Sequence, residues 1–252
     1  MNPEPPLELQ PQPQPEPPPE RYPFWGYGDL LVFAGLTIPC MLLGFGVIKA
    51  AFWILHLHPA VKTWELLLEQ FAGYALLFGA LYAIFRLQYA RPFWASLAWT
   101  RARMPLSQII LAGVAAVFAV SLIATAIQPP NTSNPMLELL KDRTSIALIA
   151  IFGVTLGPLC EELAFRGFLQ PLLVRSLGTV PGILAAALPF GLLHFQEYGN
   201  SWKHVLLISL AGAAFGWMRH ATGSTKAAAI MHGAYNALFF VAFLAQSKLP
   251  AH

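Results

Sequence analysis

Long apolar runs are the feature that most constrains this chain. A bilayer core about 30 Å thick requires roughly 20 consecutive apolar residues in each helical span, and the sequence contains several runs near that length. Of the 252 residues, 56% are hydrophobic and only 11% are charged, whereas soluble domains carry about 25% charged residues. A water-soluble core could not bury so much apolar surface, so we expect an all-α, polytopic membrane protein.

Seven apolar runs are predicted to be transmembrane helices. The run 145–177 would measure about 50 Å as one straight helix, so we expect it to bend at Pro158 and Pro171, because proline breaks helical hydrogen bonding. A complete split at Pro158 would give eight spans. The other runs are 30–55, 66–85, 106–127, 180–195, 205–218 and 227–245.

The chain divides into three predicted regions. Residues 1–28 form a proline-rich tail that cannot build a packed core and is predicted to be disordered. Residues 29–140 are predicted to hold N-terminal transmembrane helices followed by a short interfacial helix at 136–143. Residues 141–247 carry the polar motifs described below and form the predicted catalytic membrane domain.

Loop charges indicate the orientation of the chain. Four arginines, Arg86, Arg91, Arg101 and Arg103, lie between the second and third runs, and the positive-inside rule places such a loop in the cytoplasm. The N-terminus is then cytoplasmic as well, and we expect the inner membrane of a bacterium. The net charge of +3 is spread along the chain, which argues against a nucleic-acid partner.

Two adjacent acids lie inside the run 145–177, where an ionisable group costs about 2.5–3.5 kcal/mol. Glu162 and Arg166 are four residues apart, so on a helix they are neighbours with the acid on the favourable N-terminal side. Glu161 points about 100° away from that pair. The pattern therefore predicts one neutralised, supporting acid and one acid free to act as a general base. The alternative is a structural ion pair that joins helices.

Two histidine motifs follow, Phe190-Gly-Leu-Leu-His194 and His232-Gly-Ala-Tyr-Asn236. His232 and Asn236 are four residues apart and would share one helical face. Each motif taken alone also fits a purely structural role, because histidine and asparagine often form hydrogen bonds that hold membrane helices together.

Helical geometry brings the first histidine to the acids. Gly178 is the predicted turn of a hairpin, with Glu161 17 residues before it and His194 16 residues after it. Each residue would lie about 25 Å from the turn, so both reach the same depth. His232 lies only some 14 Å beyond a second predicted turn at Gly223, so helix tilt must bring it to the acids.

Such a cluster is suited to hydrolysis by one of two routes. A carboxylate, assisted by histidine, can take a proton from water, while histidine and asparagine can stabilise an oxyanion. Alternatively, Glu161, His194 and His232 could bind a zinc ion with one open position. The sequence leaves both routes open. A cysteine mechanism through Cys160 is disfavoured, because a thiolate forms poorly in an apolar helix.

The three motifs together resemble the CPBP or Abi family, which contains CAAX-processing endoproteases and bacteriocin-processing or immunity proteins. That family is marked by E-E-x-x-x-R, then F-x-x-x-H, then H-x-x-x-N. The matching residues lie within about 145–245, and no motif position departs from the pattern. They are Glu161, Glu162, Arg166, Phe190, His194, His232 and Asn236.

This resemblance implies an intramembrane endopeptidase that cleaves a membrane-associated protein or peptide, with prenylated CAAX proteins as one substrate class. Glu161 would activate water with help from His194, and the two polar residues of the third motif would stabilise the oxyanion. Glu162 and Arg166 would orient the site. The family is also described as metal-dependent.

Two other functions fit the same residues. A non-catalytic immunity or scaffold protein would use the polar cluster only to hold helices together. A transporter or haem carrier could use the histidines and acids, but the sequence shows no inverted repeat, and haem ligation would leave both glutamates unexplained.

Overall fold

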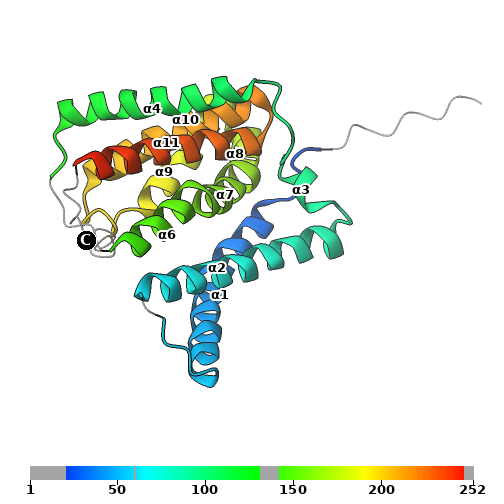
Figure 1. Cartoon of the computed structure of the whole chain (residues 1–252). Helices are drawn as coiled ribbons and strands as arrows, with labels where there is room; N and C mark the ends of the chain where they lie inside the picture. The colour runs from blue at the N-terminus through cyan, green and yellow to red at the C-terminus, as the bar shows by residue number, and fades with distance from the viewer. Residues whose placement is uncertain (1–20, 60, 131–141, 247–252) are drawn as a thin grey trace, which may run out of the picture.

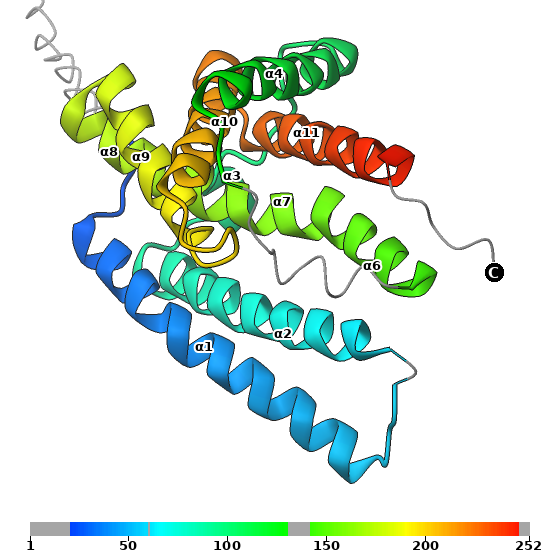
Figure 2. The same cartoon turned by 90° about the vertical axis from the view of Figure 1, so that its left-hand side faces the viewer.

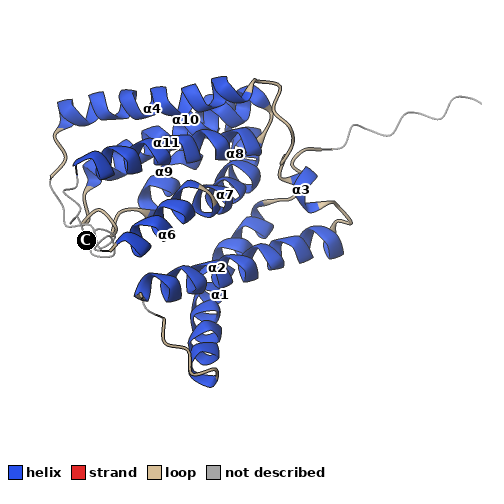
Figure 3. Cartoon of the chain, in the orientation of Figure 1, coloured by secondary structure: helices blue, strands red, loops and turns tan. Residues whose placement is uncertain are grey.

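The computed structural model describes residues 21–59, 61–130 and 142–246, and within these ranges all regular structure is helical (Figure 3). The predicted all-α fold is therefore confirmed. Residues 1–20 of the predicted tail and residues 136–141 of the predicted interfacial helix lie outside the described residues. Residues 21–28 were also predicted to be disordered, and this is wrong, because Trp25 is buried against η2 and α1 begins at Tyr27. The first half contains α1 (Tyr27–Ile54), α2 (Lys62–Ala83), the π-helical η1 (Ile84–Gln88), α3 (Phe93–Ser96) and α4 (Leu106–Ile127).

The second half forms the part of the fold that contains the polar motifs. Helices α4 and α11 lie side by side, α8 and α9 form a hairpin, and α1 and α2 form a pair beside α6 (Figures 1 and 2). The elements of this half are α6 (Arg143–Val154), α7 (Leu156–Glu162), the π-helical η2 (Leu163–Leu169), α8 (Gln170–Leu177), α9 (Thr179–Leu193), α10 (Trp202–Thr222) and α11 (Thr225–Gln246).

Proline explains the breaks in the long apolar run, although each break lies before the proline and not at it. Pro158 cannot donate to the carbonyl of residue 154 and crowds it, and α6 ends there, at Val154, with Thr155 at φ −119° and ψ −78°. Pro171 lies near the start of α8 and follows the π-helical η2. The predicted break at Pro158 therefore occurs about one helical turn earlier, whereas at Pro171 the chain stays helical and changes from η2 to α8 at Gln170.

Four helical segments are long and apolar enough to cross a membrane, and they are Tyr27–Ile54, Lys62–Gln88, Leu106–Ile127 and Arg143–Leu177. Thr179–Leu193 is a shorter apolar helix. In the most apolar window of α1 only 17% of the residues are buried inside the protein, so lipid must cover much of this helix. The protein is thus an integral membrane protein, and the count of seven or eight spans stays a prediction.

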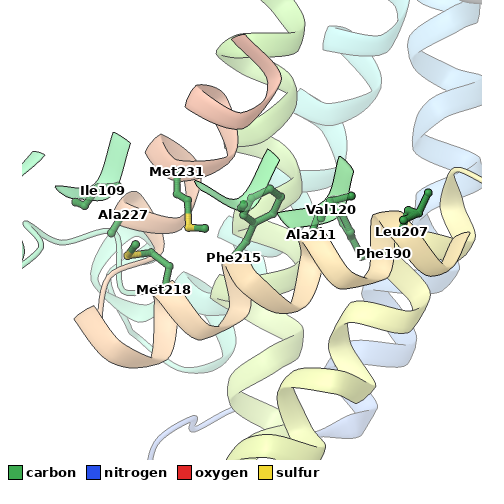
Figure 4. Packing of buried hydrophobic residues seen from close by; sticks show 10 residues of the cluster. Ile109, Val120, Phe190, Leu207, Ala211, Phe215, Met218, Ala227 and Met231 are labelled. Atoms are coloured by element: carbon green, nitrogen blue, oxygen red, sulfur yellow. The ribbon is translucent and has the colours of Figure 1, made fainter. Parts of the chain in front are cut away.

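The main core lies where α4, α9, α10 and α11 meet (Figure 4). Phe215 of α10 lies near its centre and packs against Met231 of α11 and Phe190 of α9. The other buried members are Ile109, Ala116, Val120, Leu207, Ala211, Met218 and Ala227.

A second core anchors the residues just before α1 to η2. Trp25 is fully buried and its Nε1 donates to the carbonyl of Phe168, 3.1 Å away. The two rings stack with centroids 5.4 Å apart, and Phe85 packs on both. Arg175 of α8 donates to the carbonyls of Pro23 and Trp25. The segment before α1 is therefore fixed against η2 and α8.

Glycine permits the closest approach between α4 and α11. A Cβ atom on Gly113 would lie 2.5 Å from the carbonyl oxygen of Met231 and 3.0 Å from the Cβ of Ala234. The carbonyl belongs to a helix backbone and cannot move without displacing α11. Gly79 of α2 provides a contrast, because a Cβ there would meet nothing within 4 Å.

We expect Gly113→Ala to lower the free energy of unfolding by about 1–3 kcal/mol, the usual cost of overpacking a core. Gly79→Ala is the matched control, and it should be neutral or stabilising, because alanine is favoured over glycine in a helix by about 0.5–1 kcal/mol. Unfolding of both variants in detergent would test this. Equal effects of the two substitutions would show that α4 and α11 do not pack as described.

Candidate active site

The two acids end α7 and have different surroundings. Glu162 is fully buried, and its Oε1 accepts a hydrogen bond from Arg166 Nη1 at 2.8 Å. Glu161 has 27% of its side chain exposed, and the hydrogen bond and ion pair of Arg166 go to Glu162. The predicted separation of a paired acid from a freer one is therefore present. Arg166 lies in η2, so the pair also joins the α-helical and π-helical segments.

Arg166 connects this pair to the neighbouring helices. It is 1% exposed, and its Nη2 donates to the carbonyl of Gly212 in α10 at 2.6 Å. The guanidinium lies 4.4 Å from the centroid of the Phe190 ring, a favourable arrangement of a cation on an aromatic face. A Cβ on Gly212 would lie 2.9 Å from Nη2, so glycine is needed for this approach.

His232 of α11 contacts both acids. Its Nδ1 lies 3.0 Å from Glu162 Oε1, and its Nε2 lies 3.8 Å from Glu161 Oε2. Because the ionised carboxylate of Glu162 can only accept, Nδ1 carries the proton that it donates. The Phe215 ring stacks on the imidazole with centroids 4.4 Å apart. The ring is thus held with Nε2 directed to Glu161.

His194 and Asn236 are held by backbone carbonyls. His194 ends α9, and its Nδ1 donates to the carbonyl of Phe190 at 2.9 Å, which leaves Nε2 as an acceptor. His194 also interacts electrostatically with Glu161, less strongly than His232 does. Asn236 Nδ2 donates to the carbonyl of Gly153 in α6 at 2.7 Å. His232 does reach the depth of the acids, and Asn236 fixes α11 against α6.

Three aromatic residues near the acids were not predicted. Tyr74 of α2 and Tyr198 of the α9–α10 loop both interact electrostatically with Glu161. Burial raises the pKa of Tyr198 to about 12, and the carboxylates of Glu197 and Glu161 add to this shift, so its phenol stays protonated at neutral pH. Tyr198 follows His194 by one helical turn, a spacing that could have indicated it. Nothing in the sequence connects Tyr74 or Phe215 with the motifs.

The expected zinc ligands do not form a compact set. Among the described ranges, no three histidine, cysteine, aspartate or glutamate side chains lie close enough together to hold a metal ion. His232 Nδ1 is occupied by Glu162, and only its Nε2 faces Glu161. Glu161, His194 and His232 as placed do not fit a zinc site, so no chemical step is derived through a metal. Metal dependence stays a prediction.

Comparison with known families gives the identity of this region. A family model described as type II CAAX prenyl endopeptidase Rce1-like matches residues 143–238. This region belongs to the CAAX protease family. The matched CAAX protease domain begins with α6, ends within α11 and contains all six predicted site residues. No curated protein and no solved structure gives a significant match.

We expect Arg166→Met to lower the stability of the CAAX protease domain by about 3–5 kcal/mol, because Glu162 would be left as an uncompensated buried charge. Glu162→Gln combined with Arg166→Met should recover part of this loss. The free energy of unfolding of the purified protein in detergent is the measurement.

Arg86→Met is the matched control, since Arg86 is exposed and makes no described contact. Its effect should stay within about 0.5 kcal/mol, as for most surface substitutions. If Arg166→Met lowered the free energy of unfolding no more than Arg86→Met, the buried charge of Glu162 would not need Arg166 for its stabilisation.

Proposed function

We propose that this protein is an intramembrane endopeptidase that hydrolyses a peptide bond of a membrane-associated protein, with prenylated CAAX-type proteins as the substrate class. One observation carries the proposal. Glu161 faces His232 Nε2 across 3.8 Å, while Glu162 is neutralised by Arg166 and accepts a hydrogen bond from His232 Nδ1. A site with one acid held in an ion pair and one acid accessible to water suits general-base hydrolysis.

The spacing between Glu161 and His232 suits a water molecule as the reactant. Both facing atoms are hydrogen-bond acceptors when Glu161 is ionised and His232 is neutral, and water has two O–H groups to donate. Glu161 takes one proton as the water oxygen bonds to the substrate carbonyl carbon. The same proton then passes to the leaving nitrogen as the C–N bond breaks. Glu161 and His232 are thus the proposed catalytic pair.

The proposed roles of the other residues follow from their contacts. Glu162 and Arg166 fix the imidazole of His232 and so act as positioning residues. His194, at the end of α9, and Tyr198, in the following loop, both interact electrostatically with Glu161. The Tyr198 phenol can donate a hydrogen bond to the oxyanion of the tetrahedral intermediate. Asn236 keeps a second amide N–H for the oxyanion role expected of it from the sequence.

The orientation expected from the loop arginines is part of the proposal. Arg219 of α10 donates to Tyr22 Oη, and Thr225 N donates to the carbonyl of Ala98. The N-terminal segment, the α3–α4 loop and the α10–α11 turn therefore meet at one end, which is rich in basic residues. We propose that this end is cytoplasmic in a bacterial inner membrane.

Glu161→Gln should reduce cleavage by about 10²–10⁴-fold, the usual contribution of a general base, without lowering the melting temperature. The measurement is cleavage of a farnesylated CAAX peptide by protein reconstituted in liposomes. Glu65→Gln in α2 is the matched control, because among the described residues Glu65 forms its ion pair with Lys49, away from the site, and it should keep normal cleavage.

Two results would contradict this assignment of roles. Full cleavage by Glu161→Gln, together with loss of cleavage in a folded Glu162→Gln variant, would reverse the roles of the acids. Equal losses of stability and activity in Glu161→Gln would support a non-catalytic role for the cluster.

Cleavage should also persist in an excess of a strong metal chelator, because the proposed pair of Glu161 and His232 activates water without a metal ion. The comparison is the initial cleavage rate before and after dialysis against the chelator. A loss of activity that zinc restores would instead show that Glu161, His194 and His232 rearrange to hold a metal.

A further inference from the structure

A basic groove lies at the ends of α4 and α11, on elements that carry no catalytic side chain at this point. It has a volume of about 570 Å³. Three cationic side chains line it, Arg101 and Arg103 from the segment before α4 and Lys226 from the first turn of α11. A second hollow of about 480 Å³ adjoins it and shares both arginines.

These three cations have no protein partner among the residues that the structure describes. All three are exposed, and none makes a hydrogen bond or an ion pair there. No acidic residue lines either hollow. Arg175 and Arg219, near the same end of the molecule, are instead used to bind Trp25 and Tyr22. The groove therefore combines three unneutralised positive charges in a small volume.

The remaining wall of the groove is apolar and leads toward the membrane. Met104, Leu106 and Ile109 line it from the α4 side, and Ile230 lines it from α11. Leu106 is 57% exposed and is the first residue of α4, which is one of the four segments able to span a membrane. The positive end of the α4 helix dipole adds to the potential here. A ligand that fits must have an anionic head beside an apolar chain.

We propose that this groove binds an anionic phospholipid, with the phosphate on Arg101, Arg103 and Lys226 and an acyl chain along Leu106, Ile109 and Ile230. Arginine matches the geometry of phosphate oxygens through paired N–H donors. A phospholipid is always present at the end of a membrane-spanning helix, whereas a soluble anion would gain nothing from the apolar wall.

The bound lipid would connect α4 with the helix that carries His232. Ile230 lines the groove, and Met231 contacts α4 at Gly113. His232 is the next residue on α11. Lipid binding is therefore expected to stabilise the packing of α11 against α4. This stabilisation would occur whether or not the protein cleaves any peptide.

The test is the affinity of the purified, full-length protein for phosphatidylglycerol, measured by native mass spectrometry and by the rise in melting temperature with added lipid. Each basic residue near an anionic membrane surface contributes about 1 kcal/mol, or roughly fivefold in the dissociation constant. Arg101→Gln combined with Arg103→Gln should thus weaken binding about 25-fold. High salt should weaken wild-type binding.

Arg86→Gln is the matched control, because Arg86 lies outside the groove and is also exposed. The affinity of this variant for phosphatidylglycerol should stay within about twofold of the wild-type value, because Arg86 does not line the proposed site. The proposal is overturned if phosphatidylcholine binds as tightly as phosphatidylglycerol, or if the double variant keeps its affinity while folded. It is also overturned if inorganic phosphate alone gives the same stabilisation, which would indicate a site for a soluble anion.

Discussion

The buried guanidinium of Arg166 is the interaction on which the rest of the site depends. It is almost inaccessible, and three partners hold it: Glu162, the carbonyl of Gly212 and the face of Phe190. A charge in an apolar interior is tolerated only when it is paired and hydrogen-bonded. Through Glu162 the arginine fixes His232, so one side chain of η2 connects α7, α9, α10 and α11. The catalytic geometry proposed for Glu161 rests on this arrangement.

Local periodicity was sufficient to predict much of this site. The spacing of Glu162 and Arg166 predicts their contact, and apolar run length predicts helices and membrane insertion. The turn at Gly178 is also present, at φ +86°, where glycine carries no steric cost. These features depend on residues that are close in sequence. The period of the α-helix alone is enough to predict them.

Contacts between distant segments could not be predicted in the same way. Depth along two hairpins suggested His194 as the nearer partner of Glu161, whereas His232 lies nearer, because α11 packs against α6 and α7. Tyr74 reaches the site from α2, and no motif refers to that helix. Asn236 bonds to a backbone carbonyl, which any residue could have provided. The break before Pro158 shows that the clash of a proline ring acts on the preceding turn.

The π-helical η2 limits which changes of sequence this region can accept. Arg166 and Gln170 bond to the carbonyls of Gly212 and Gly216 in α10, two acceptors that are themselves one turn apart. Loss or gain of one residue in η2 would rotate everything after it by about 100° and would turn Gln170 and the aromatic contact at Phe168 away from their partners. Insertions and deletions should therefore be excluded from Leu163–Leu169 far more strictly than replacements of side chains. Leu163–Leu169 therefore sets the rotational register of the helix that follows it, as well as the position of Arg166 in the site.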